Sequence, residues 1–283
     1  MPTRRLLGPG TLTWEVNREP AAFLGGGRAL LMQVAHPAVA AGVSRHSDYQ
    51  NHPWQRLVRT VDTTLKMAFA NEGVSSHAAA RLEQSHKPVH GRTEDGISYN
   101  ARDPELMLWV WATLVDTTVL MYETCIRRLS EEDRERLYSE QKLFAEACGL
   151  RRSICPHKWD DFKAYVNGVL RNDVQITEAA QVIARSVLAP GPASLSAVTT
   201  WHSILTVYLL PEELRRSYDF SPHLDRPEVA RRVLGSVSVA FRLLPGPVRR
   251  MPVTVAIAIP ERFTQPRARR EQVPSGVAPG ARR

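Results

Sequence analysis

Residues 103–117 read DPELMLWVWATLVDT, which combines a strong helix start with a long apolar segment. Asp103 is a typical helix cap, and Pro104 follows it at the first helical position, where the missing amide proton of proline costs nothing. The apolar sequence behind them continues almost to Arg127. A helix that is apolar nearly all round belongs inside a protein. The sequence therefore predicts a helix that begins at Asp103 and lies at the centre of the core.

Helical periodicity continues on both sides of this stretch, whereas the alternation typical of strands is almost absent. Caps and helix breakers place the ends of the other segments. Further helices are expected over residues 19–24, 28–44, 51–70, 75–88, 130–149, 158–171, 177–188, 194–210, 212–218 and 227–244. The chain is therefore predicted to be an all-α protein.

Two interruptions near the amino terminus are informative. Gly25, Gly26 and Gly27 separate the first two helices, and their missing side chains let the backbone approach a neighbour closely. Pro37 removes an amide donor and moves His36 out of the α region. A bend is expected at His36.

The length of 283 residues suits one large or two small domains. The Pro-Gly-Pro segments at 190–192 and 245–247 are too short to be interdomain linkers. Residues 262–283 are rich in arginine and lack apolar periodicity. We therefore expect one multi-helix domain over residues 1–261 and a disordered, basic tail over residues 262–283.

Charge and composition restrict the partners. The net charge of +8 invites nucleic acid or an anionic membrane surface, but the basic excess lies in the tail and no nucleic-acid-binding motif accompanies it. Nucleic-acid binding is therefore not expected. No secretory signal and no apolar run long enough to span a bilayer is found in the sequence. These features predict a cytoplasmic protein and leave weak contact with a membrane surface open.

The three cysteines, Cys125, Cys148 and Cys155, lack the spacing of a zinc or iron–sulfur site. Their odd number also argues against a disulfide framework. They are expected to be reduced.

Several polar residues interrupt segments that are otherwise apolar. An unpaired polar group in a core costs about 1–3 kcal/mol, so a group of such residues indicates a site. The candidates are His36, Arg56, Arg59, Thr60, His86 and His90.

Arg56, Arg59 and Thr60 share one helical face because they are spaced by three and four residues. A solvated polar stripe is the alternative interpretation, although threonine is a poor choice for an exposed helical surface. His86 and His90 have the spacing of a two-histidine metal site, but Pro88 between them disturbs the helix. A single histidine facing a planar cofactor in an apolar slot fits better.

The segments GGGRALLMQVAHPAVAAGVSRHS, RLVRT, HKPVHG and DPELMLWVWATLVDT resemble, in this order, the family of latex-clearing rubber oxygenases and fungal MpaB-type oxygenases. The resemblance is strongest from about Gly8 to Arg128 and continues to about Leu244. It implies a helical domain that encloses a pocket for haem b, the iron cofactor. It also implies that His86 is the proximal iron ligand and that the arginines and the threonine of RLVRT, Arg56, Arg59 and Thr60, lie on the opposite, oxygen-binding side.

Three positions depart from the family pattern. His90 stands where the family more often has an arginine that contacts the cofactor. Arg59 replaces a lysine, and a guanidinium stays protonated, so it cannot act as a displaceable iron ligand. Trp111 stands where short bacterial relatives carry histidine, so any proton transfer by that histidine is lost.

Other residues have two interpretations. His36 either lines the pocket or is a core histidine that bonds a carbonyl. Asp116 is expected to form an ion pair with Arg56 or Arg28. The tryptophans either wall the slot or pack in the core; they are Trp54, Trp109 and Trp111.

These observations predict a haem b-dependent oxygenase or oxidase that uses dioxygen and acts on a hydrophobic small molecule, isoprenoid-like or another apolar natural product. Two alternatives remain open. One is a non-catalytic haem-binding member of the same family, suggested by the changes at His90 and Trp111. The other is an all-α scaffold without cofactor whose basic tail binds acidic partners. The oligomeric state is not predicted.

Overall fold

The computed structural model describes residues 6–47, 62–70, 72–93, 95–188 and 196–258. The amino-terminal half contains α1 Leu12–Asn17, α2 Ala21–Leu24, α3 Gly26–Val34, α4 Pro37–His46, α6 Glu72–His86, β1 His90–Arg92, β2 Ser98–Asn100 and α7 Pro104–Cys125. The remainder contains α8 Glu131–Ala147, η1 Arg152–Ile154, α9 Trp159–Asn172, α10 Glu178–Val187, α11 Ser196–Leu209, α12 Glu212–Tyr218, α13 Pro227–Leu243 and α14 Gly246–Ala258. Residues 62–69 are also helical. The predicted all-α class is confirmed.

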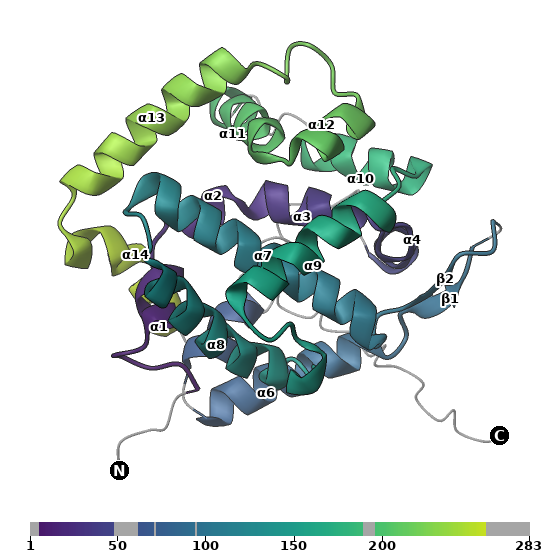
Figure 1. Ribbon diagram of the computed structural model, residues 1–283, viewed down its shortest axis with the longest axis horizontal. Helices are drawn as coiled ribbons and strands as arrows, with labels where there is room; N and C mark the ends of the chain where they lie inside the picture. Colours follow the sequence, from purple (N-terminus) through teal and green to yellow (C-terminus); the bar gives the residue numbers. More distant parts are fainter. Residues whose placement is uncertain (1–5, 48–61, 71, 94, 189–195, 259–283) are drawn as a thin grey trace, which may run out of the picture.

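Helix α7 lies at the centre of the structure, as the sequence predicts (Figure 1). It packs against α1, α2, α3, α8, α9 and α13. Trp109, Trp111 and Met121 on this helix are almost completely buried. The long apolar segment therefore organises the core, because helices from both halves of the chain contact it.

Local signals explain where the main helices begin and end. The carboxylate of Asp103 accepts a hydrogen bond from the backbone N–H of Glu105 at 2.9 Å, which caps α7. The hydroxyl of Ser130 accepts from the backbone N–H of Asp133 at 3.0 Å and caps α8. After the end of α8, Gly149 has a positive φ of 93°, a conformation that favours glycine. Most of the observed helix ends lie within two residues of the predicted ends, because such local signals fix them.

A small β-hairpin is the main departure from the predicted elements. β1 and β2 pair antiparallel, with Gly91 opposite Tyr99. Each strand has only three residues, which is too short for alternation to be visible in the sequence. Tyr99 is buried against Ala38 and Ala41 of α4, so packing on α4 rather than strand pattern stabilises the hairpin.

Helices α1 and α14 were not expected from the sequence. α1 is a short helix that Thr11 caps through its side chain. α14 contains Pro252, which the sequence rules treat as a helix breaker. Among the described residues, no helix has the length and apolar character needed to cross a membrane.

All three cysteines carry free thiols, as predicted. Burial raises the pKa of the Cys148 thiol to about 12. Residues 262–283 lie outside the described part of the chain, so the division into a helical domain and a tail stays a prediction.

Candidate functional site

His86 lies at the end of α6, where Pro88 prevents the helix from continuing. Its side chain is half-buried, and this burial lowers the pKa of the imidazole below its ordinary value of 6.5. Within the described part of the chain, its ring makes no hydrogen bond and no ion pair. His86 is therefore a neutral imidazole at pH 7, with a ring nitrogen available to a ligand.

His36 caps helix α4. Its φ of −79° and ψ of 122° are extended, which confirms the bend predicted from Pro37. Its ring nitrogen Nδ1 accepts a hydrogen bond from the backbone N–H of Ala38 at 3.2 Å. Burial lowers the pKa of the imidazole, although the charges of Asp173 and Asp103 act in the opposite direction. His36 thus has a structural role, and its contact with a cofactor stays a prediction.

His90 is exposed at the start of β1. Its Nδ1 donates a hydrogen bond to the carbonyl oxygen of Lys87 at 3.0 Å. His86 ends a helix whereas His90 begins a strand, so the two rings do not share one helical face. In the residues that the structure describes, no group of three or more His, Cys, Asp or Glu side chains is placed to hold a metal ion.

Arg56, Arg59 and Thr60 lie outside the described residues. The described chain stops at Ser47, just after α4, and resumes at Asp62. The role of RLVRT therefore stays a prediction.

A buried ion-pair cluster joins three helices near the centre of the core. Arg28 of α3 contacts Asp116 of α7 at 2.6 Å, and the two side chains are only 6% and 7% exposed. Lys163 of α9 binds the other carboxylate oxygen of Asp116. Arg28 also donates to the hydroxyl of Thr117 and to the carbonyl oxygen of Leu209. Of the two partners predicted for Asp116, the structure confirms Arg28.

The charge state of Asp116 follows from this environment. Burial acts to raise the pKa of the carboxyl, but the charges and hydrogen bonds of Arg28 and Lys163 outweigh it and hold the pKa below the usual value. Asp116 is therefore ionised. Lys163 was not predicted as a partner because its sequence context is that of an amphipathic surface helix.

The glycines before Arg28 allow two helices to approach α3 closely, as predicted. A Cβ at Gly25 would lie 2.8 Å from Cγ of Met121 on α7. A Cβ at Gly27 would lie 2.8 Å from Cγ2 of Thr206 on α11 and nearer still to its hydroxyl oxygen. The interruption is shorter than predicted, because only Gly25 separates α2 from α3.

Helix α11 brings two further polar residues to this region. The ring of His202 also faces Gly27, and burial lowers the pKa of its imidazole. Thr206 is fully buried, and its hydroxyl has no hydrogen-bond partner in the part of the chain that the structure describes. His202 could have been identified from the sequence, because it is a histidine within an otherwise apolar helix.

Trp111 is part of an aromatic cluster. Its ring lies 5.9 Å from that of Tyr138 and 6.0 Å from that of Phe162, measured between centroids. Trp111 is 3% exposed, and its indole N–H has no partner among the described residues. Trp109 is also buried in the core, whereas Trp54 lies outside the described residues. Core packing is therefore confirmed for Trp109 and Trp111.

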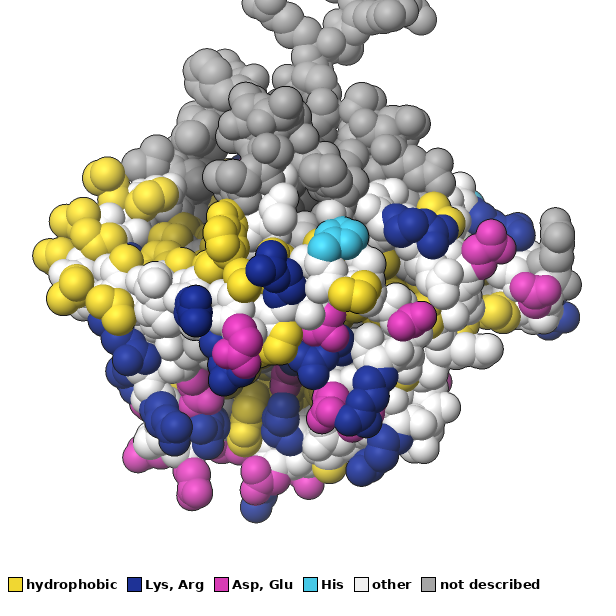
Figure 2. Space-filling view, turned by 90° about the horizontal axis from the view of Figure 1, so that it is seen from above, with side chains coloured by type: hydrophobic (Ala, Val, Ile, Leu, Met, Phe, Trp, Pro, Cys, Tyr) yellow, Lys and Arg dark blue, Asp and Glu magenta, His cyan; other side chains and the backbone are white. Residues whose placement is uncertain are grey.

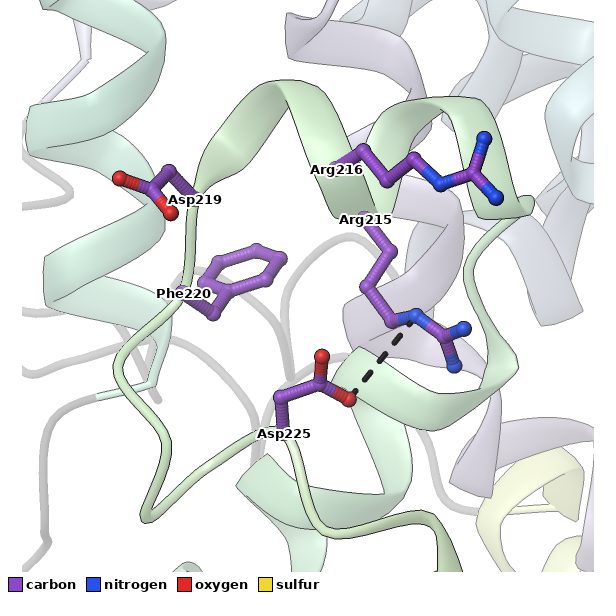
Figure 3. Close-up of a pocket in the computed structure, with 5 residues that line it drawn as sticks. All are labelled: Arg215, Arg216, Asp219, Phe220 and Asp225. Atoms are coloured by element: carbon purple, nitrogen blue, oxygen red, sulfur yellow. Dashed lines mark ion pairs between the residues drawn. The ribbon is translucent and has the colours of Figure 1, made fainter.

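A surface pocket near α12 has a different character (Figure 3). Its lining residues are Arg215, Arg216, Asp219, Phe220 and Asp225. Arg215 and Asp225 form an ion pair across it at 3.8 Å. This lining is mostly charged, so it does not suit an apolar macrocycle.

We expect acid to destabilise the protein, because three histidines have lowered pKa values in the folded state. Near and below pH 6.5 these histidines bind protons more readily in the unfolded chain than in the folded protein; they are His36, His86 and His202. The free energy of unfolding should therefore fall as the pH decreases from about 7.5 to about 5.5. Urea titrations across this range measure the effect.

The variant His36→Asn provides the matched control for this prediction, because asparagine retains a capping oxygen but does not titrate. Its stability should depend less steeply on pH than that of the wild type. Equal slopes, or a wild type that becomes more stable in acid, would contradict the prediction.

The fold is all-α and is built around α7, which helices from both halves of the chain contact. The family model of the ER-bound oxygenase mpaB/B'/Rubber oxygenase catalytic domain matches residues 14–244. The chain therefore belongs to this oxygenase family.

Two curated relatives also resemble the chain. An uncharacterized protein of Mycobacterium bovis is 27% identical over 194 residues, which cover 65% of this chain and 74% of the relative. An uncharacterized protein of Mycobacterium tuberculosis matches with the same identity and coverage. No solved structure matches the chain significantly.

Proposed function

We propose that the protein is a haem b-dependent oxygenase or oxidase that uses dioxygen to oxidise a hydrophobic small molecule, isoprenoid-like or another apolar natural product. Membership of the oxygenase family supports the reaction class. The observation that carries the cofactor assignment is the state of His86, a neutral, half-buried imidazole whose ring makes no hydrogen bond within the described chain.

The chemistry of His86 fits an iron ligand. Haem iron is commonly held by a single neutral imidazole, so lowering the pKa of that imidazole favours the ligating form. When bound, haem b supplies the activation of dioxygen. His86 would hold the iron from the end of α6, and two further histidines, His36 and His90, are proposed at the edge of the cofactor. Because Nδ1 of His90 is hydrogen-bonded to the carbonyl oxygen of Lys87, Nε2 is the ring atom that could interact with a haem propionate.

Arg56, Arg59 and Thr60 are proposed for the opposite side of the cofactor. A guanidinium and a hydroxyl there would stabilise negative charge that develops on oxygen. Arg59 adds a permanent positive charge and cannot deprotonate to bind iron. These assignments rest on the family pattern of RLVRT.

Haem titration of the purified protein, followed by oxygen-uptake measurements with a reductant, tests the proposal. We expect saturable binding of one haem per chain and oxygen uptake that increases when an isoprenoid or another apolar substrate is added. Haem binding without oxygen uptake would instead identify a non-catalytic haem protein. Absence of a haem absorption band after reconstitution would favour a scaffold without cofactor.

A further inference from the structure

The corner where α13 meets α14 exposes a group of large apolar side chains. Figure 2 shows apolar side chains gathered at this edge of the molecule, with basic side chains beside them. The exposed fractions are 57% for Val239, 79% for Leu243, 45% for Leu244, 56% for Val248 and 59% for Met251. We call these five side chains the apolar corner. Single exposed apolar residues are ordinary, but a contiguous group usually marks an interaction surface.

Packing and hydrogen bonds anchor the apolar corner to the rest of the protein. On the inner side of α13, Leu234 packs with Met121 and Leu205, which fixes this helix to the core. At the turn, Arg249 of α14 donates to the carbonyl oxygens of Phe241 and Leu244 at 2.6 and 3.0 Å.

The guanidinium of Arg249 is itself anchored. It is paired with the carboxylate of Glu19, which is only 3% exposed. The apolar side chains are therefore presented to solvent by a fixed turn, and they do not fold back onto the protein.

The charge of α13 and α14 is mainly positive, and Glu19 pairs with Arg249 and Arg250 at the turn. Residues 226–258 contain six arginines and a single glutamate, Glu228, and no acidic residue follows it in this range. Arg232, Val239 and Leu243 stand at offsets of seven and eleven residues, so they share one face of α13. Arg242, also exposed, lies next to this face, and its guanidinium donates to the carbonyl oxygen of Thr124 on α7 at 3.1 Å. Apolar side chains bordered by arginine on one surface are typical of binding to an anionic lipid surface.

We propose that the apolar corner inserts into the interface of an anionic membrane while Arg232 and Arg242 contact the lipid headgroups. A second copy of the chain fits less well, because each arginine-rich corner would repel its partner. The five apolar side chains are also few beside the roughly 20–30 residues that each partner contributes to a standard protein interface. The arrangement gives the protein reversible attachment to a membrane without a spanning helix.

Sedimentation of the full chain with lipid vesicles tests this proposal. Vesicles of phosphatidylcholine with one third phosphatidylglycerol should bind the wild type, and pure phosphatidylcholine should bind it much more weakly. Raising the salt from about 0.1 M to about 0.5 M should weaken the binding, because the arginine contribution is screened. Light scattering should show the same oligomeric state for the wild type and every variant.

Two double variants separate the contributions. Leu243→Ser with Met251→Ser should lower the partition coefficient at least about tenfold, because two large apolar side chains no longer enter the membrane. Arg232→Gln with Arg242→Gln should lower it about fivefold per charge. Both pairs are exposed, so the variants should fold normally by circular dichroism. Leu6→Ser and Arg102→Gln, which change exposed residues elsewhere, are the matched controls and should bind as the wild type does.

Unchanged binding of the Leu243→Ser, Met251→Ser variant would overturn the proposal, because charge elsewhere in the chain would then explain the binding. A change in oligomeric state in this variant would also overturn it and would assign the apolar corner to contact between copies.

Discussion

Replacing Arg28 with alanine should lower the free energy of unfolding by about 3–5 kcal/mol, because it leaves the buried carboxylate of Asp116 with only one cationic partner. That partner, Lys163, is 41% exposed, so solvent weakens its effect on the carboxylate. The same substitution leaves the hydroxyl of Thr117 and the carbonyl of Leu209 without their donor. Urea denaturation measures the change.

Two further variants make the test specific. Arg28→Met combined with Asp116→Leu removes both charges and should recover most of the lost stability, because apolar side chains of similar volume replace the buried pair. Arg216→Ala breaks an exposed ion pair with Glu212 and should cost at most about 1 kcal/mol. A loss below about 1 kcal/mol for Arg28→Ala would show that the buried cluster does not stabilise the core.

Gly27→Ala should destabilise the protein by about 1–3 kcal/mol, because the added methyl group overlaps the side chain of Thr206. Thr206 is fully buried on α11, so it has no room to rotate away and the two helices must separate. Thermal and urea denaturation measure the loss.

Shortening the Thr206 side chain should remove most of the stability loss caused by Gly27→Ala. In the background of Thr206→Ala, the substitution Gly27→Ala should cost much less, and the double-mutant cycle gives the coupling between the two positions. Gly168→Ala is the control, because nothing lies within 4 Å of a Cβ there, and it should raise stability by about 0.5–1 kcal/mol. If Gly27→Ala lowered the free energy of unfolding equally in both backgrounds, contact between Gly27 and Thr206 would not be the cause.

The helical framework could be predicted because its signals are local. Asp103 with Pro104, and Ser130, are caps whose partners lie within three residues in the sequence. The hairpin could not be predicted, since it depends on Tyr99 packing against a helix about 60 residues earlier in the chain. Helix α14 could not be predicted either, because Pro252 lies inside it and Arg249 anchors it to distant Glu19.

The candidate site could be predicted only in part. The conflict between a polar residue and an apolar segment made His86 a candidate. Asp116 was predicted to pair with Arg56 or Arg28, and the structure shows Arg28 together with Lys163. Lys163 was missed because the pairing of α7 with α9 is a tertiary contact. The sequence placed His90 beyond the helix that ends near Pro88, but it did not show that His90 would be exposed on a strand. Tertiary packing, not local preference, determines these arrangements.

The absorption spectrum of the ferric protein reconstituted with haem b, compared between the wild type and His86→Ala, tests whether His86 holds the iron. We expect His86→Ala to lose or change the histidine-ligated spectrum and added imidazole to restore it. His77→Ala, which removes an exposed histidine from the same helix, should leave the spectrum unchanged. A His86→Ala protein whose ferric spectrum equals that of the wild type would show that His86 does not hold the iron.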